Sequence, residues 1–232
     1  METSQPSKSR GNGRIRPARA LGRLVFPLLF SALAVQAQFT FTTNNGAIRI
    51  ASYTGSDNTV TIPDTFNGQP VVSLGIFVFN RCTNLVSVTI PASITNFGLS
   101  PFYFCTNLLA AYFEGNVPVD FAPGAPPIFF NDPNVTLYYL PGATHATLDG
   151  LPTALWLPQV QNCDASFGIR TNQFGFNINW ASGQVVVVEA ATNLASPVWT
   201  PVATNTLTGS PSYFSDPQST NYPGRFYRLR SP

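Results

Sequence analysis

The stretch CTNLVSVTIPASITNFGLSPFYFCTNL, residues 82–108, decides the fold. It begins and ends with the same tetrapeptide, CTNL, which occupies residues 82–85 and again residues 105–108. With the same offset of 23 residues, Gly75 corresponds to Gly98 and Phe79 to Phe102. Recurrence at a fixed spacing of this length is the signature of a repeat architecture, in which each unit stacks on its neighbour.

The residues between the two cysteines follow a recognisable order. The positions that define the unit are Cys82, Leu85, Val88, Ile90, Pro91, Phe97, Gly98, Phe102 and Cys105. This order resembles the BspA-like leucine-rich repeat, with Pro101 in place of that family's alanine. The resemblance covers residues 60–108, although the unit that begins at residue 60 is looser and longer. It implies a β-solenoid that serves adhesion or protein interaction.

Physical reasons support the choice of residue at each position. Val88 and Ile90 can point inward from a short strand that stacks about 4.8 Å from the next one. Pro91 ends the strand because it has no amide hydrogen for the ladder. We expect Gly98 to permit a sharp return of the chain, while Phe97 and Phe102 fill the interior.

The cysteines at equivalent repeat positions are expected to lie one above the other, small and buried. Export would allow a disulfide between Cys82 and Cys105. We favour free thiols, because the resembled family uses cysteine there as core filler and because Cys163 leaves an odd number.

A solenoid needs several turns to bury its apolar face, so we expect weaker turns on both sides of the clear repeats. Residues 108–113, 138–141 and 155–158 repeat the strand pattern in part. Residues 39–50 alternate around Asn44-Asn45-Gly46, which predicts a β-hairpin that caps the solenoid. The predicted solenoid domain spans residues 38–158 and includes a proline-rich loop at 118–127.

A second pattern follows a polar segment. We interpret residues 159–173 as a linker and residues 174–232 as a C-terminal β domain. Apolar residues alternate over 174–180, residues 185–188 are four consecutive valines, and further strands are expected at 199–204, 212–215 and 225–229. The predicted fold class is therefore mainly β: a short leucine-rich-repeat β-solenoid followed by a small antiparallel β-sandwich-like domain.

The charges are distributed unevenly along the 232 residues. Six of the twelve basic residues and one of the ten acidic residues precede an apolar run at residues 24–35. This pattern predicts a signal peptide over residues 1–37; a membrane anchor is the alternative, but it needs about 18 to 20 apolar residues. The remainder has six basic and nine acidic residues, a net charge of −3 and no lysine, which disfavours nucleic-acid binding.

The sequence offers little for catalysis. His145, the single histidine, could be paired with Asp149, but no nucleophile motif accompanies them. Glu114, Asp120 and Asp132 are carboxylates that a polysaccharide hydrolase could use. We interpret Glu114 and Glu189 as strand-edge residues that discourage aberrant pairing. No spacing predicts a metal site, and no cofactor is expected.

Aromatic residues are abundant, with 19 Phe and 8 Tyr. Because strand side chains alternate, most point inward, and we name Tyr103, Tyr112 and Tyr139 as candidates for an exposed binding patch. The leading hypothesis is an exported, non-catalytic binding or adhesion module that presents its repeats to a protein or glycan at the cell surface. The alternatives are a structural scaffold of the envelope or matrix, with a C-terminal domain that attaches, sorts or spaces it, and a polysaccharide hydrolase.

Overall fold

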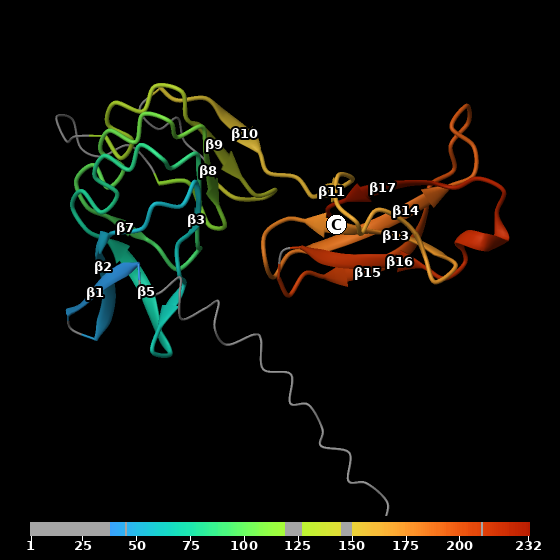
Figure 1. Cartoon of the computed structure of the whole chain (residues 1–232), viewed down its shortest axis with the longest axis horizontal. Coiled ribbons are helices and arrows are strands. Elements are labelled where there is room, and N and C mark those ends of the chain that lie inside the picture. The colour runs from blue at the N-terminus through green and yellow to red at the C-terminus, as the bar shows by residue number, and fades with distance from the viewer. Residues whose placement is uncertain (1–37, 45, 119–126, 145–149, 210) are drawn as a thin grey trace, which may run out of the picture.

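The chain folds into two β bodies joined end to end (Figure 1). The computed structural model describes residues 38–44, 46–118, 127–144, 150–209 and 211–232. The predicted signal peptide, Asp120, and the pair His145 and Asp149 lie outside these described residues. The first body contains the strands β1 to β10, and the second contains β11 to β17.

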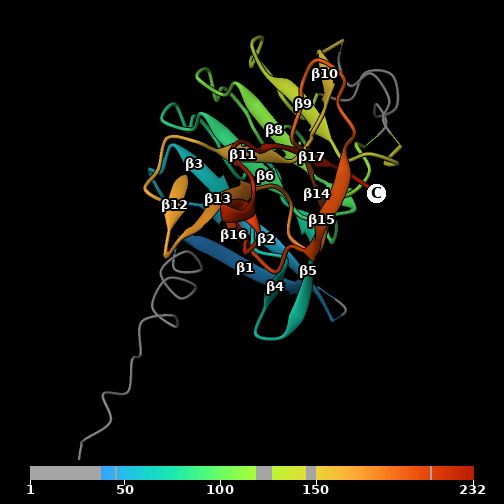
Figure 2. The same ribbon diagram turned by 90° about the vertical axis from the view of Figure 1, so that its right-hand side faces the viewer.

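A parallel five-stranded sheet forms one wall of the first body. Its strands are β3 (Thr59–Thr61), β6 (Ser87–Ile90), β8 (Ala110–Phe113), β9 (Thr136–Tyr139) and β10 (Thr153–Leu155). Each pairs in parallel with the next, and Figure 2 shows them as successive steps. The predicted solenoid is confirmed. The strands β8, β9 and β10 lie at or next to the weaker repeats at residues 108–113, 138–141 and 155–158.

The N-terminal end of the solenoid is closed by a hairpin. As predicted, β1 (Phe39–Asn44) and β2 (Ala47–Tyr53) pair antiparallel across a turn that contains Gly46 at φ 80°. β2 then pairs in parallel with β5 (Gln69–Leu74), which also contacts β4 (Thr65–Phe66) and β7 (Asn96–Phe97). Ile50, Val71 and Leu74 bury the hairpin's inner face against the solenoid core.

The wall opposite the parallel sheet is held by phenylalanine rings. Phe79, Phe102 and Phe129 stack with centroids 4.9 and 5.0 Å apart and rings within 13° of parallel. The backbone is also bonded from rung to rung, since the Phe79 N–H donates to the Pro101 carbonyl at 2.7 Å. These rungs therefore form a second hydrogen-bonded wall, and the rings fill the space between the two walls.

Gly98 has a different role from the one expected. Its φ does not lie in the left-handed region, so no sharp return requires a glycine. A Cβ at this position would instead lie 2.6 Å from the carbonyl carbon of Gly75, the equivalent residue of the preceding rung. The Gly98 N–H donates to the Leu74 carbonyl at 2.9 Å. Glycine is needed because the two backbones approach too closely for a side chain.

Replacing Gly98 with Ala is expected to lower the free energy of unfolding by about 1–3 kcal/mol, because the contacted atoms are backbone and the rungs must separate. Urea denaturation of the variant and the wild type measures the loss. Gly224→Ala is the matched control, since no heavy atom lies within 4 Å of the Cβ position there. Equal denaturation midpoints for all three proteins would contradict the close-approach explanation.

The turn that follows each phenylalanine repeats over three rungs. Arg81, Phe104 and Asn131 all have φ between 55° and 60°. The next residues are Cys82, Cys105 and Asp132, whose carbonyls accept bonds from Leu85, Leu108 and Val135. Both cysteines are free thiols, Cys105 buried and Cys82 half-buried, and the Cys105 Sγ donates to the Phe79 carbonyl. Asp132 thus occupies, in the third rung, the place that cysteine holds in the first two.

The second body is a sandwich of two antiparallel sheets. One contains β11 (Gln159–Gln161), β12 (Gly168–Arg170), β13 (Gln173–Asn179) and β16 (Ser212–Asp216), with the 3-10 helix η1 (Ser219–Asn221) beside β13. The other has the order β15 (Thr200–Thr206), β14 (Val185–Ala191) and β17 (Phe226–Arg230). Trp180, Phe176 and Val188 are among the buried residues between them.

Residues 159–173, which we expected to be a linker, belong to this sandwich. Both β11 and β12 pair with β13, and the Ser166 Oγ accepts the Asn177 N–H at 2.9 Å. Edge pairing of this kind uses backbone hydrogen bonds and polar side chains, so it leaves no apolar periodicity in the sequence.

Glu189 lies on the central strand β14 and not at a strand edge as expected. Its side chain is 7% exposed and accepts bonds from Arg228 at 2.7 Å and Arg230 at 3.2 Å. The Arg228 bond is the main cause that lowers the Glu189 pKa. The carboxylate therefore ties β14 to its neighbour β17.

Candidate ligand-binding groove

A groove of about 530 Å³ lies between the outer face of the solenoid sheet and the sandwich. The solenoid wall contributes Thr59, Thr61, Ser87, Thr89, Tyr112 and Glu114. The other wall comes from the connection after β10, from β11, and from β13 and its turn; its residues are Trp156, Gln159, Asn179, Trp180, Ala181 and Ser182. Residues from the two bodies thus meet at one hollow.

The solenoid wall of the groove carries rows of aligned polar side chains. Thr61 pairs with Thr89, Thr89 with Tyr112, and Tyr112 with Tyr138, so these four form one row across the strands β3, β6, β8 and β9. In the neighbouring row, the Ser87 Oγ donates to the Thr59 Oγ1 at 3.1 Å. The rows lie on the outer face because Val60, Val88, Ala111 and Leu137 alternate with them and fill the core.

Aromatic rings form one end of the groove. Tyr112 stacks on Tyr138 with centroids 4.8 Å apart, and the Trp156 ring lies 4.9 Å from Tyr112. Burial raises the pKa of the Tyr112 hydroxyl, so this group stays protonated. The Trp180 Nε1 donates to the Trp156 carbonyl at 2.8 Å, which joins the sandwich core to this end.

Glu114 is the single carboxylate among the described residues that line the groove. It follows β8 directly, and its N–H donates to the Ile90 carbonyl at 3.0 Å. Burial raises the pKa of the Glu114 carboxyl, the nearby charge of Asp64 raises it further, and a hydrogen bond from the Ser182 backbone lowers it. The carboxylate thus faces the sandwich and contacts its turn.

The three tyrosines named from the sequence lie in different places. Tyr112 lines the groove. Tyr103 lies on the opposite wall, stacked against Phe130 at 5.3 Å and next to Phe77 at 4.9 Å. Tyr139 pairs with the buried Phe113 on the inward row and is half-buried against the core, so it does not lie beside Tyr112 on the outer row. The strand alternation places its neighbour Tyr138 outward instead.

Several groove residues were not found from the sequence. Trp156 and Trp180 were read only as parts of strands, and the threonine and serine rows were not recognised. Thr59, Thr61, Ser87 and Thr89 alternate with buried aliphatic residues, and this alternation was the available signal for an outer polar face. Among the hydrolase candidates, Asp132 is buried in the solenoid at 2% exposure and does not line the groove.

Metal ligation finds no support in the part of the chain that the structure describes, where no three His, Cys, Asp or Glu side chains gather. Across the same residues, no helix has the length and apolar content to cross a bilayer.

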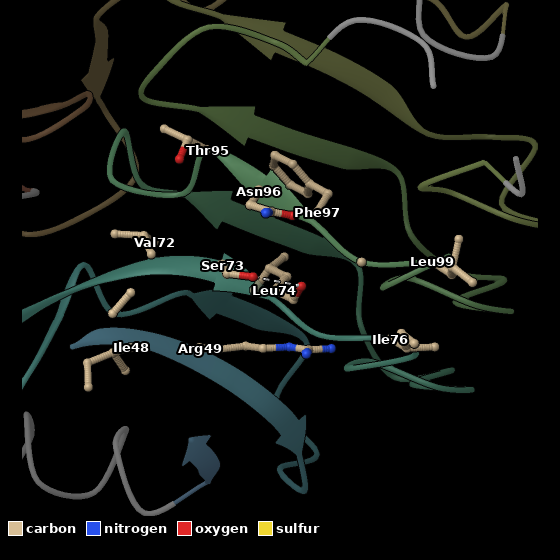
Figure 3. A pocket seen from close by; sticks show the side chains of 12 residues that line it. Ile48, Arg49, Val72, Ser73, Leu74, Ile76, Thr95, Asn96, Phe97 and Leu99 are labelled. Carbon is tan, nitrogen blue, oxygen red and sulfur yellow. Dashed lines mark hydrogen bonds between the residues drawn. The ribbon is translucent and has the colours of Figure 1, made fainter. Parts of the chain in front are cut away.

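A second hollow, also about 530 Å³, lies over the sheet of the N-terminal cap (Figure 3). Arg49 pairs with Ser73, and Ser73 with Asn96, so the three form a polar row across β2, β5 and β7. Ile76 and Leu99 are about half exposed beside it. The aromatic residue of its described lining is Phe97, which is 8% exposed, so this hollow does not present a half-exposed ring as Tyr112 does in the groove.

Comparison with known proteins gave two similar structures. No protein-family model matches the sequence, and no curated protein matches it. A leucine-rich cell surface protein of Faecalibacterium prausnitzii is 29% identical, over 43% of this chain and 28% of that one, with a TM-score of 0.37. The T. pallidum leucine-rich repeat protein is 18% identical, over 44% of this chain and 69% of that one, with a TM-score of 0.31.

The present chain therefore spans less than a third of the length of the Faecalibacterium protein. The rungs of the chain itself decide the architecture. Leu85, Leu108 and Val135 are buried at the same turn of successive coils, and each comes shortly before a strand of the parallel sheet. The solenoid is thus built of stacked coils that repeat the same buried aliphatic position. In these repeats the parallel strands present their outer face to the groove, and the sandwich forms the second wall.

Proposed function

We propose that this protein is an exported, non-catalytic glycan-binding module that acts at the cell surface and holds its ligand in the groove. The observation that carries the proposal is the combination, on one face, of the Tyr112 platform with rows of aligned hydroxyl side chains. Export is supported by the basic and apolar pattern at residues 1–37, which is typical of a signal peptide.

Sugar chemistry matches the two kinds of side chain. The C–H face of a pyranose ring is apolar and packs on an aromatic ring, while its hydroxyls both donate and accept hydrogen bonds. Thr61, Thr89 and Ser87 provide groups that can do the same, and Gln159 provides an amide. A concave site with a few converging polar groups and aromatic walls is the usual form of a small-ligand site.

The groove favours a glycan over a protein partner. Protein interfaces centre on buried aromatic and arginine anchors surrounded by a polar rim. None of the described residues that line the groove is an arginine or a lysine, and hydroxyl side chains make up most of its solenoid wall. A hollow with this lining fits a chain of sugars better than the surface of a folded protein.

Binding without hydrolysis is favoured by the distribution of carboxylates. Glycosidases place two carboxyl groups on either side of the scissile bond. Glu114 contributes the one carboxyl group of the described lining, and Asp64, whose charge acts on it, lies outside that lining. Release of shorter products during prolonged incubation with a bound oligosaccharide would contradict the non-catalytic proposal.

Replacing Tyr112 with Ala tests the platform. Aromatic packing of this kind contributes about 0.5–1.5 kcal/mol beyond the area that it buries, so affinity is expected to fall by about tenfold or more. A glycan array run on residues 38–232 identifies a ligand, and calorimetry then measures the dissociation constant. Circular dichroism and thermal melting check the fold of each variant.

Tyr103→Ala is the matched control, because Tyr103 is a stacked tyrosine of the same solenoid that lies on the other wall. The affinity of the Tyr103→Ala variant for the identified glycan is expected to equal that of the wild type. Equal losses in the two variants, or a protein that binds no glycan, would contradict the proposed function.

A further inference from the structure

We infer that the groove takes an uncharged, linear polysaccharide chain that lies across the solenoid strands, and that it rejects acidic sugars. The inference rests on the proposed function and adds to it the class of glycan and the direction in which the chain runs. Three features of the groove carry it: the direction of the side-chain rows, their change in chemistry from one end to the other, and the charge at Glu114.

The rows of the groove run perpendicular to the strands. Thr61, Thr89 and Tyr112 are paired residues on the consecutive strands β3, β6 and β8, so equivalent side chains recur at the strand spacing of about 4.8 Å. This interval is close to the length of one hexose in an extended β-1,4-linked chain. A chain laid across the strands can therefore place one sugar on each rung, whereas a chain laid along a strand would leave the row after one contact.

The chemistry of the row changes along its length. Hydroxyl groups occupy the β3 and β6 positions, at Thr61 and Thr89, and rings occupy the β8 end, at Tyr112 and Trp156. One sugar can stack at the ring end while the following sugars exchange hydrogen bonds with the hydroxyl end. A ligand that uses the whole row is therefore an oligosaccharide of several units and not a monosaccharide.

The charge of the groove discriminates among such chains. Glu114 lies at the ring end, with the negative charge of Asp64 close enough to act on it. No lysine, arginine or histidine is found among the described residues of the lining. A uronate or sulfate brought to this wall would meet a carboxylate with no cation to neutralise either, and like charges in a partly desolvated site repel strongly. A neutral sugar can instead donate a hydroxyl to Glu114 in a charge-assisted hydrogen bond.

The test compares the affinities of neutral and acidic oligosaccharides of the same length. Cello-oligosaccharides and chito-oligosaccharides of one to six units serve as neutral probes, and oligogalacturonides serve as acidic probes, with calorimetry as the readout. Three described strands form the solenoid wall of the groove, so affinity for a neutral probe is expected to rise up to three or four units and then level. At equal length, the acidic probe is expected to bind at least tenfold more weakly. Acidic probes that bind as well as neutral ones would overturn the inference.

Glu114→Gln separates charge from shape. Glutamine keeps the side-chain length and an oxygen that can accept the Ser182 hydrogen bond, but it removes the negative charge. The ratio of the dissociation constants of the acidic and neutral probes is therefore expected to fall roughly tenfold. Asp64 is exposed and lies outside the lining, so Asp64→Asn should reduce the difference in affinity between neutral and acidic probes by a smaller factor. Added salt should also reduce this difference in the wild type, since ions screen the repulsion.

The outcomes distinguish this inference from the proposed function. If neither Glu114→Gln nor Asp64→Asn changes the difference in affinity between neutral and acidic probes, the proposed charge selectivity is overturned. A loss of neutral-glycan binding in Tyr112→Ala would still support a glycan groove. Affinity that does not depend on chain length would overturn the orientation across the strands. Failure of every neutral and acidic probe to bind would contradict the proposed function itself.

Discussion

Replacing Asp132 with Asn is expected to raise the free energy of unfolding at pH 8 by about 4 kcal/mol and to leave it nearly unchanged at pH 4. Asp132 is 2% exposed, and among the described residues its carboxylate oxygens have no partner at normal hydrogen-bond geometry; the Cys105 backbone interacts with them weakly and offsets only part of the burial. Burial raises the pKa of this carboxyl from 3.8 to about 7. Each unit of such a shift corresponds to about 1.4 kcal/mol of stability, which gives the expected size.

The direction of the pH dependence follows from the raised pKa. Well below pH 3.8 the carboxyl is protonated in both the folded and the unfolded chain, and it carries no penalty. As the pH rises toward 7, the unfolded chain loses this proton before the folded chain does, so the Asp132 contribution destabilises the wild type progressively. In Asp132→Asn the side chain is neutral at every pH, and this part of the pH dependence disappears.

Urea denaturation at intervals between pH 4 and pH 8 measures the effect on both proteins. Asp132→Cys is a second variant, because cysteine occupies the equivalent position in the two preceding rungs and is tolerated there. It is expected to stabilise the protein at pH 8 as Asn does. Stability curves for wild type and Asp132→Asn that run parallel across this pH range would show that the carboxylate is hydrated and not buried.

Replacing Phe102 with Ala is expected to lower the free energy of unfolding by about 3–5 kcal/mol, the range for removing a large buried aromatic side chain. The Phe102 ring is fully buried and stacks on Phe79 at 4.9 Å and on Phe129 at 5.0 Å. Its loss would open a cavity between the two walls and separate the rungs on either side. Because a domain is stable by only about 5–15 kcal/mol in total, the variant is expected to be close to unfolding at 37 °C.

Guanidinium denaturation followed by circular dichroism measures this loss. Leu109→Ala is the control, since Leu109 belongs to the same repeat but is 53% exposed. Phe102→Leu, which keeps part of the volume, is expected to fall between the control and the Ala variant. A loss below about 1 kcal/mol for Phe102→Ala would mean that the ring stack is not what holds the two walls together.

The spacing of the repeats was enough to predict the rungs around the two cysteines. The offset of 23 residues aligned Cys82 with Cys105 and Phe79 with Phe102, and the structure places both pairs on neighbouring rungs. The third rung was harder, because its equivalent turn at Asp132 follows after 27 residues. Because of the longer spacing, the sequence of this rung no longer aligns with the preceding repeats, but the backbone turn is kept, as the positive φ of Asn131 shows.

The candidate site was predictable only in part. Tyr112 was found because strand alternation makes one residue of each apolar pair point outward, but the same argument placed Tyr139 outward when Tyr138 holds that position. An error of one residue in the register of a strand exchanges its two faces. The groove itself could not be predicted, since Thr59 and Ser182 on its two walls are more than a hundred residues apart in the sequence.

The sequence by itself determined the periodic features of this protein: a repeat of about two dozen residues, strands that end before proline, a capping hairpin and a C-terminal set of alternating strands. Such features depend on interactions between neighbours in the chain or between identical rungs, and these leave a regular pattern of residue types. The tertiary structure alone decided which residues face the groove, why Gly98 must be glycine and where Asp132 is buried. Those depend on how closely separate segments approach in space, and no local pattern records that distance.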